Sequence, residues 1–350
     1  MSEKKYWQED EWIDMPEFVQ ENKQAIKRVA INFESEEDMT KFNEVTGLNI
    51  TMKTKGVFFP LQKSKKKEYR YTKNTSLKYP IYVISKGRWE KRLTINALEE
   101  MSIPYKVIVE PEEYNNYLKY VSAENILVLP ENFSRLGQGS IPVRNWVWEY
   151  SIKSGDEKHW ILDDNISGFE RLNRNERVRV KNGSMFRAAE DFVDRYENIA
   201  FAGFEYRQFG GGARRPKPPF KTNYRVYSCT LIRNDLPYRW RGKFNEDTDI
   251  CIRALKDGWV TVTFNCFLQN KIGTMSMKGG NTDSIYDKTD NRKEFAESLK
   301  KQHTDIVEVV WRYNRWHHEV DYSSFQNNKL IKKKNIILGE KVNNYGMELL

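Results

Sequence analysis

The chain has 350 residues, enough for two domains or for one large α/β domain with an appendage. Its 39% hydrophobic and 13% aromatic residues can build a hydrophobic core, and no apolar run approaches the ~18 residues that a membrane-spanning helix needs. The formal net charge of +9 favours a polyanionic partner such as nucleic acid, although many proteins without such a partner are mildly basic.

The N-terminal sequence and the cysteines both bear on the cellular compartment of the protein. The first ten residues lack the apolar segment of a signal peptide, so we expect a soluble cytoplasmic protein with no membrane contact. Cys229, Cys251 and Cys266 have neither C-x-x-C spacing nor a nearby pair of histidines. This favours reduced thiols packed in a core.

Residues 1–60 are predicted to form a small β-α-β accessory module. A strand is expected over residues 28–33, a helix starts after Ser35 and ends at Gly47, and a second strand covers residues 48–52. The segment carries no obvious chemistry. We interpret it as an adaptor or docking module, the alternative being a part of the main fold.

A basic linker is predicted over residues 61–78. From Gln62 to Lys78 it holds seven basic residues and one acidic residue, with tyrosines between them. This composition is typical of a solvated linker. Basic side chains alternating with tyrosines could also follow a nucleic-acid backbone, and the candidates are Lys65, Lys66 and Lys67.

From Tyr79 onward, apolar runs alternate with amphipathic stretches. Strands are expected at 80–84, 105–109, 126–129 and up to Asp163, with helices at 90–101, 112–120 and 141–152 between them, and further strands near 199–204 and 225–232. This alternation predicts an α/β fold with a mostly parallel central sheet. Such sheets bind ligands beyond the carboxyl ends of their strands.

The clearest candidate site is H-W-I-L-D-D-N-I-S-G-F at residues 159–169. An apolar run that indicates a buried strand stops at Asp163, Asp164 and Asn165. Oxygen ligands at a strand end suit Mg²⁺ or Mn²⁺, whose coordination is completed by substrate phosphates. The same letters also suit an ordinary turn, so a plain loop is the alternative.

Two turns could bind a nucleotide near this site. Ser85-Lys86-Gly87-Arg88 follows the first strand of the main domain, where Gly87 lets the backbone approach a ligand and Arg88 could meet phosphates. The turn L-G-Q-G-S-I-P-V-R-N places Arg144 and Asn145 near the positive end of a helix. It lacks the G-x-G-x-x-G spacing, which argues against a dinucleotide site.

An acidic cluster, N-E-D-T-D, begins the helix predicted to end at Gly258. Acids at a helix N-terminus can simply stabilise the helix dipole. A carboxylate held there, Glu246 or Asp247, could instead act as a general base toward an acceptor hydroxyl.

Residues 207–221 contain five basic residues, no acid, three glycines and three prolines. The segment is too long for a simple turn, and we interpret it as a site for a phosphate backbone, the alternative being a solvated loop. The basic residues are Arg207, Arg214, Arg215, Lys217 and Lys221.

Two later segments are weaker candidates. Lys278 and Gly279 suit a loop at a donor site. Of the paired histidines that follow Trp316, His318 could contact a metal or a diphosphate, although surface histidines often have no such role.

In their order and spacing, S-K-G-R, the glycine-rich turn, H-W-I-L-D-D-N-I and N-E-D-T-D-I-C-I-R-A-L resemble a GT-A-type glycosyltransferase. More narrowly, they are similar to the phage branch of the TET/JBP-associated glycosyltransferases, which place sugars on hydroxymethylated pyrimidines in DNA. The resemblance covers residues 79–322, so a GT-A-like domain is expected there, followed by a basic C-terminal tail at 323–350.

The resemblance also implies roles. Asp163, Asp164 and Asn165 would occupy the D-x-D position that holds a metal-bridged nucleotide-sugar diphosphate, with asparagine as a weaker ligand than aspartate. Glu246 or Asp247 would be the base. Residues expected at the nucleotide-sugar are Ser85, Gly87, Arg88, Arg144, Asn145, Asp163, Lys278, Gly279 and His318.

The implied reaction moves a sugar from a UDP-sugar, with Mn²⁺ or Mg²⁺, to the hydroxymethyl group of a modified pyrimidine in double-stranded phage DNA, foremost 5-hydroxymethylcytosine, in the host cytoplasm. The base would have to leave the duplex, with Tyr206, Phe209 and Phe220 as candidates to fill the gap. The alternatives are a glycan or protein acceptor, a nucleotidyltransferase, disfavoured because no G-x-G-T-R-like loop follows the first strand, and a non-catalytic DNA-binding protein. The sugar, the stereochemistry and the oligomeric state stay open.

Overall fold

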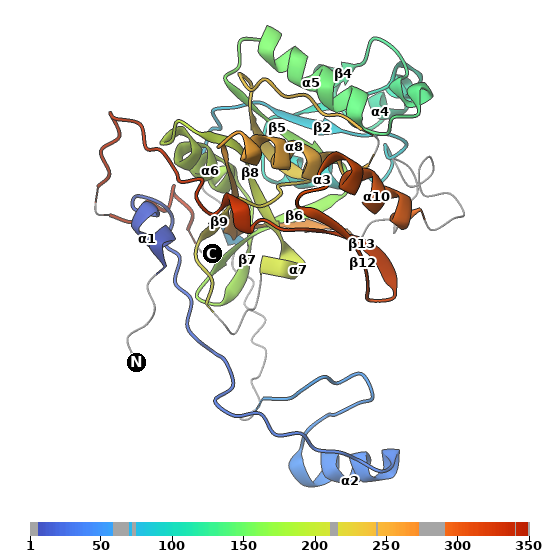
Figure 1. The fold of residues 1–350 in the computed structure, drawn as a ribbon, viewed down its shortest axis with the longest axis vertical. Coiled ribbons are helices and arrows are strands. Elements are labelled where there is room, and N and C mark those ends of the chain that lie inside the picture. Colours follow the sequence, from blue (N-terminus) through green and yellow to red (C-terminus); the bar gives the residue numbers. More distant parts are fainter. Residues whose placement is uncertain are drawn as a thin grey trace.

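A computed structural model describes residues 6–58, 70–71, 75–210, 216–242, 244–272, 291–339 and 341–348. Within these ranges the main body is built on one 11-stranded sheet, in the order β1-β7-β6-β11-β8-β10-β5-β2-β3-β4, with β9 paired to β11. Helices cover both faces of this sheet (Figure 1). The α/β class that the sequence predicts is confirmed.

One half of the sheet is parallel, as predicted. It comprises β2 (Ile81–Ile84), β3 (Lys106–Val109), β4 (Ile126–Val128) and β5 (Lys158–Asp163), connected through α3 (Leu93–Glu100), α4 (Tyr114–Leu118) and α5 (Ile141–Lys153). The helix expected over 112–120 is instead a 3-10 turn, η1 (Pro111–Glu113), followed by the short α4.

The other half of the sheet is mixed. Its strands are β6 (Ile166–Asn173), β7 (Glu176–Val180), β8 (Ile199–Tyr206), β9 (Phe220–Thr222), β10 (Cys229–Arg233), β11 (Val260–Lys271) and the two-residue β1 (Arg70–Tyr71). β10 is antiparallel to both β5 and β8, and β11 is parallel to β8. The strand expected over 225–232 starts later, at Cys229, and residues 225–228 form a loop that leads into it.

This topology brings four carboxyl ends to one edge. Because β10 reverses direction between them, β5 and β8 run parallel, and β2 and β11 run with them. The residues Ser85, Asp163, Tyr206 and Lys271 at or just beyond these ends consequently lie along the same edge.

Two buried clusters fill the layers on either side. One packs α3 and α6 (Ser184–Asp194) against the sheet, with Trp160, Phe186 and Phe204 in contact at ring-centroid distances of 4.9–5.2 Å. The other packs α5 and α8 (Glu246–Lys256) on the opposite face. The three cysteines are free and buried in these layers, as predicted.

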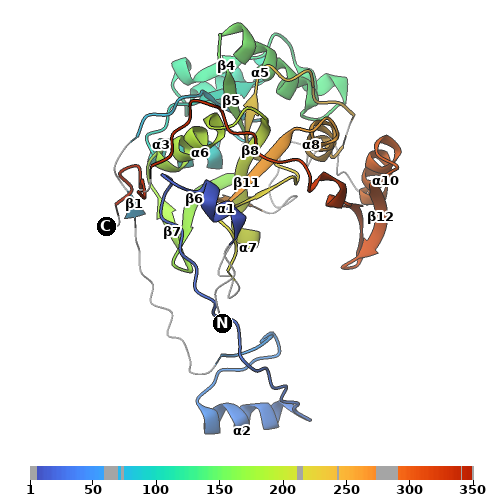
Figure 2. The ribbon, with the colours of Figure 1, turned by 60° about the vertical axis from the view of Figure 1, so that its left-hand side comes forward.

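The N-terminal region differs from the predicted module. Helix α2 (Glu36–Thr46) is capped by Ser35 and closed by Gly47 in the left-handed region, as expected. Residues 28–33 and 48–52 form no strands, because they have no neighbouring strand to pair with among the described residues. Helix α2 lies apart from the main body, as Figure 2 shows.

Both chain ends contribute to the main body. Next to α1 (Trp7–Glu11), the buried Trp12 packs against Phe192 and Phe264 of the main core. Near the other end, Lys332 forms an isolated antiparallel β-bridge with Tyr196, and Met347 is buried in the same core. The boundaries 1–60 and 323–350 stay predictions, but these ends are not free segments.

The remaining elements extend the body on one side. Helix α10 (Arg292–Gln302) packs with the hairpin of β12 (Val307–Arg312) and β13 (Arg315–Val320), and η4 (Ser323–Phe325) follows. Leu299, Val307 and Phe325 join them to the face of α8. Among the described helices, none has the length and apolar character needed to cross a membrane.

Candidate active site

Asp163, the last residue of β5, is the centre of the candidate site. Its Oδ1 accepts a hydrogen bond from Arg144 Nη2 at 2.8 Å, and its Oδ2 accepts one from Lys271 Nζ at 2.7 Å. Lys271 also donates to Ser228 Oγ at 2.6 Å. The ends of β5 and β11, the residue before β10 and the first turn of α5 thus bring two cations and two oxygen-bearing side chains together.

Burial and charge act in opposite directions here. Burial alone would raise the pKa of Asp163, but the charges of Lys271 and Arg144 outweigh it and hold the pKa well below its ordinary value. Burial alone would lower the pKa of Lys271, and Asp163 reverses that effect, so this pKa is raised. Both groups are therefore charged at neutral pH.

Asp164 faces the opposite side, toward β2. Its carboxylate accepts a hydrogen bond from Ser85 Oγ at 2.8 Å and pairs with the Arg88 guanidinium. Ser85 Oγ also lies 2.6 Å from the hydroxyl of Tyr117. Burial raises the pKa of Asp164, and Arg88 opposes part of that rise.

The first strand-to-helix turn is held by a buried acid. Gly87, at a φ of 66° in the left-handed region, donates its N–H to the Glu113 carboxylate at 3.0 Å. Lys86 pairs with Glu110 at 2.9 Å. The turn predicted to meet a nucleotide is thus fixed beside Asp164 before any ligand binds.

The first turn of α8 carries three carboxylates, of which Glu246 and Asp249 have different surroundings. Glu246 Oε1 accepts from Ser140 Oγ at 3.0 Å and lies 3.7 Å from Arg144 Nε, so it faces the site. Asp249 is fully buried and pairs with Arg241, Arg253 and His303. Its role is structural, as the helix-stabilising alternative expects.

Asp247 is the exceptional carboxylate. Its Oδ1 is buried and has no hydrogen-bond partner among the described residues. Burial raises the pKa of Asp247 to about 7, with Glu246 and Asp163 adding to the rise and Arg144 and Lys271 opposing it. A carboxyl group whose pKa lies near neutrality can take up and release a proton at physiological pH.

Asn145 is placed differently from expectation. Its Nδ2 donates to the Trp240 carbonyl at 2.9 Å, and its Oδ1 accepts from the Trp240 N–H at 2.8 Å. Successive helical residues point about 100° apart, so Arg144 reaches Asp163 while Asn145 does not. With both amide atoms engaged, Asn145 ties α5 to the segment before α8.

His318 contacts Arg225, and none of the described contacts of Asp163 involves it. His318 lies on β13, where its Nε2 is 3.0 Å from Arg225 Nη1. Burial and the charge of Arg225 lower the pKa of His318 to about 4, so the imidazole is neutral. Lys278 and Gly279 lie outside the described residues.

The described residues do not form an open set of metal ligands. The carboxylates of Asp163 and Asp164 are both paired with cations, and no group of three or more His, Cys, Asp or Glu residues among them could hold a metal ion. Asn165 Oδ1 is buried without a partner in the described part of the chain, but it stands alone. The arrangement does not fit a cation bound by Asp163, Asp164 and Asn165 together.

The basic segment 207–221 is partly neutralised. Arg207 pairs with Glu170 at 2.9 Å, Lys221 pairs with Glu205, and Lys217 Nζ donates to the Phe209 carbonyl at 2.6 Å. The other candidates for DNA contact, Arg214, Arg215, Lys65, Lys66 and Lys67, lie outside the described residues.

Of the three aromatic residues proposed to fill the gap left by a base, only Phe209 is exposed, at 52%. Phe220 is fully buried against Phe192, at a ring-centroid distance of 4.8 Å. Tyr206 is held by its hydroxyl, 2.8 Å from Ser228 Oγ. The expectation for Phe220 is wrong, because this residue starts β9 and points into the core.

Sequence reasoning missed Lys271 and Ser228. Lys271 closes β11, and a lysine at the end of a long apolar strand is a signal that could have been noticed. Ser228 reaches the site only because β10 runs antiparallel beside β5, and nothing in the local sequence announces that pairing.

The fold and this site define a Rossmann-like α/β protein whose polar residues converge at the carboxyl ends of its strands. The model of the TET-associated glycosyltransferase family matches residues 79–280, more than half of the chain, so the chain belongs to this family and is a glycosyltransferase. The match spans Ser85, Asp163, Asp247 and Lys271.

Other comparisons add little. No curated protein matches this chain. Among solved structures, it is similar to mannose-6-phosphate isomerase from Helicobacter pylori at a TM-score of 0.23 and 9% identity, covering 77% of this chain and 93% of that one. A similarity this low carries no argument about fold or function.

Proposed function

We propose that this glycosyltransferase moves a sugar from a UDP-sugar to the hydroxymethyl group of a modified pyrimidine in double-stranded DNA, foremost 5-hydroxymethylcytosine. Family membership supports the transfer of a sugar to modified DNA bases. The observation that carries the proposal is the buried Asp247 carboxyl group, whose Oδ1 has no hydrogen-bond partner in the described part of the chain and whose pKa is raised to about 7 although the charges of Arg144 and Lys271 oppose the rise. The GT-A type of the fold, a phage origin and action in the host cytoplasm belong to the same proposal.

The donor nucleotide is proposed to bind on the β2 side. Ser85, Arg88 and Asp164 form a polar cluster next to the turn at Gly87, where the Arg88 guanidinium can meet a nucleotide. Arg144 and Lys271 then lie between this cluster and α8, where their charges can stabilise the departing diphosphate.

The transfer step uses one carboxylate. Asp247 takes the proton of the acceptor hydroxymethyl group while the oxygen of that group forms a bond to the anomeric carbon of the sugar. The bond between that carbon and the diphosphate oxygen breaks, and the electron pair leaves with UDP. Glu246 accepts a hydrogen bond from Ser140 and lies near Arg144, and its negative charge helps to raise the pKa of Asp247.

The test is release of UDP from a panel of UDP-sugars, with duplex DNA that is either plain or contains 5-hydroxymethylcytosine. We expect turnover only with the modified DNA, and loss of turnover in Asp247→Asn and in Asp164→Ala. Asp305→Asn is the matched control, because Asp305 is an exposed acid paired with Lys256. UDP release that ignores DNA would redirect the acceptor to glycans or proteins, and no release with any donor would contradict sugar transfer.

The Mn²⁺ or Mg²⁺ expected from the D-D-N sequence stays a prediction, and none of the steps above depends on it. Parallel reactions with Mn²⁺, with Mg²⁺ and with EDTA test it. Equal UDP release in all three would contradict the expected cofactor and leave the role of Asp247 intact.

A further inference from the structure

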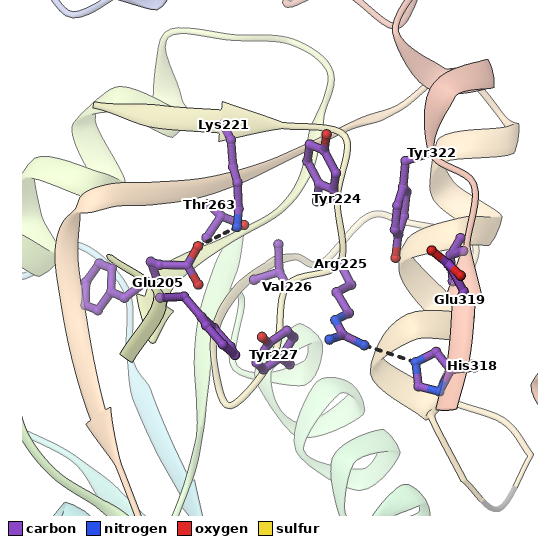
Figure 3. Close-up of a pocket in the computed structure, with 13 residues that line it drawn as sticks. Glu205, Lys221, Tyr224, Arg225, Val226, Tyr227, Thr263, His318, Glu319 and Tyr322 are labelled. Carbon is purple, nitrogen blue, oxygen red and sulfur yellow. Dashed lines mark hydrogen bonds and ion pairs between the residues drawn. The ribbon is translucent and has the colours of Figure 1, made fainter. Parts of the chain in front are cut away.

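A cavity of about 360 Å³ lies next to the end of β8. We call it the tyrosine pocket. Its walls come from the end of β8, the turn before β10 and strand β13, as Figure 3 shows. Tyr224, Tyr227 and Tyr322 line it together with Arg225, Thr263 and His318. The catalytic steps proposed above use none of these six residues.

The pocket presents flat aromatic faces and two cations, Arg225 and Lys221, of which Lys221 is paired with the lining Glu205. The guanidinium of Arg225 lies 5.0 Å from the centroid of the Tyr227 ring and bonds to His318, which is neutral. Aromatic rings and arginine planes are the surfaces on which unstacked nucleobases pack. The volume lies at the lower end of the range for small-molecule sites, which suits a single base.

Two buried hydroxyl groups lie in the walls of the pocket. Thr263 Oγ1 and the Tyr322 hydroxyl are buried and form no hydrogen bond within the described part of the chain. Figure 3 shows the Tyr322 hydroxyl pointing toward Arg225, into the cavity. Buried polar atoms are nearly always bonded, so these two hydroxyls indicate a polar ligand with donors and acceptors at its edge.

Contacts join the pocket to the candidate site. Tyr227 packs on Tyr206 at a ring-centroid distance of 4.5 Å, and Tyr206 is bonded to Ser228, which accepts from Lys271. On the other side, the N–H of Val226 donates to Cys251 Sγ at 3.3 Å, one helical turn after Asp247 on α8. These contacts connect the walls of the pocket to Lys271 and to α8, while the cluster at Ser85 lies beyond β5 on the other side of Asp163.

We propose that the tyrosine pocket receives the target pyrimidine after it has left the duplex. The proposal rests on the proposed function and names its acceptor site. The rings of Tyr227 and Tyr224 would replace the base stacking lost from the DNA, and the free hydroxyls would bond the pyrimidine edge. Phe209, exposed next to the basic segment, lies in the wall where the DNA would approach.

The first test measures base extrusion without any sugar donor. A duplex carries one 5-hydroxymethylcytosine next to 2-aminopurine, whose fluorescence rises when its neighbour unstacks. Wild type is expected to raise the fluorescence, whereas Tyr227→Leu and Arg225→Gln bind this duplex about tenfold more weakly and raise it little. Tyr313→Leu, at an exposed position of the β12-β13 hairpin, and Arg179→Gln, in an exposed ion pair with Glu100, serve as controls and keep the wild-type signal.

A paired substitution separates recognition from folding. Thr263→Val removes a hydroxyl that bonds nothing in the described free protein, so melting temperature stays the same or rises, while KM for modified DNA increases severalfold. Thr263→Ser keeps the hydroxyl and restores KM. Unchanged KM in Thr263→Val, together with unchanged extrusion in Tyr227→Leu, would overturn the proposal.

Donor binding distinguishes the two proposals. UDP binding measured by calorimetry is expected to be equal in wild type, Tyr227→Leu and Arg225→Gln. Weaker UDP binding in the pocket variants would assign the cavity to the donor nucleotide and overturn the acceptor pocket. Base extrusion without UDP release from any UDP-sugar would contradict the proposed sugar transfer and leave the pocket standing.

Discussion

At the scale of single residues, the site is a balance between carboxylates and cations in a small buried volume. Lys271 and Arg144 lower the pKa of Asp163, so this carboxylate stays ionised, whereas burial raises the pKa of Asp247 to about 7. When their environments give two neighbouring carboxyl groups very different pKa values, the two groups commonly have different roles in a reaction. In the proposed transfer, Asp163 would hold the two cations in place and Asp247 would accept the proton.

Asp247→Asn is expected to lower kcat by about 10² to 10⁴-fold, the contribution typical of a general base. In the wild type, kcat/KM with modified DNA should rise with pH through about 7, because only the deprotonated carboxylate accepts a proton. Both are measured by UDP release from pH 5.5 to 8.5. A flat pH profile would contradict the role of Asp247 even if the variant were slow.

The same carboxyl group should affect stability. Its pKa is about 7 in the folded protein and near its ordinary value of 3.8 when unfolded, so the folded state binds the proton more tightly between these values. The contribution of Asp247 to the free energy of unfolding therefore falls as pH rises through this window. Thermal melts at pH 8 should show Asp247→Asn at least as stable as wild type.

Lys271→Met is expected to reduce turnover strongly. Without Lys271, Asp163 keeps Arg144 but loses its second cation, so its pKa rises and a positive charge near the diphosphate is gone. Lys256→Met removes an equally long side chain from the exposed pair with Asp305 and should leave UDP release unchanged. Similar losses in both variants would argue for a general effect on folding.

At the scale of elements, local sequence predicts the parallel half of the sheet well. Apolar runs bounded by turn residues identify β2, β3 and β5, and the acids after Leu162 mark a strand end. The antiparallel insertion of β10 depends on distant pairing, so the site residues Ser228 and Lys271 could not be assembled from periodicity. Residues 28–33 and 48–52 do not form the expected strands, because a strand also needs a neighbouring strand to pair with, which the local sequence pattern cannot supply.

Asn145 shows how an element can displace a predicted site residue. Its amide bonds reciprocally with the Trp240 backbone, so Asn145→Ala should lower the free energy of unfolding by about 1–3 kcal/mol. KM for the UDP-sugar should be unchanged, measured by UDP release below the melting transition. A raised KM with unaltered stability would return Asn145 to the nucleotide site.

At the scale of the whole molecule, both ends of the chain lie against the main core. Trp12 is buried against aromatic residues from α6 and β11, and its Nε1 donates to the Pro16 carbonyl at 2.7 Å. Trp12→Ala should therefore lower the free energy of unfolding by about 3–5 kcal/mol in denaturant titrations. Ile26→Ala, at a fully exposed position, should have no measurable effect.

The net charge of +9 belongs to the whole molecule, although several cations of the basic segment are paired internally. If DNA is the acceptor, the affinity for a duplex should fall steeply between about 50 and 200 mM salt, as counterion release requires. Fluorescence anisotropy at several salt concentrations measures this. Affinity for the acceptor that is insensitive to salt would favour a glycan or protein instead.

The burial of the three cysteines has a practical consequence for following this enzyme in solution. Burial raises the pKa of all three thiols, to about 12 for Cys251, so thiolates are scarce at neutral pH and alkylating dyes cannot reach them. A cysteine introduced in place of the exposed Tyr313 would then be the sole reactive thiol of the folded protein. One fluorophore could be attached there without removing a native residue from the core, and energy transfer to labelled DNA would report binding in real time.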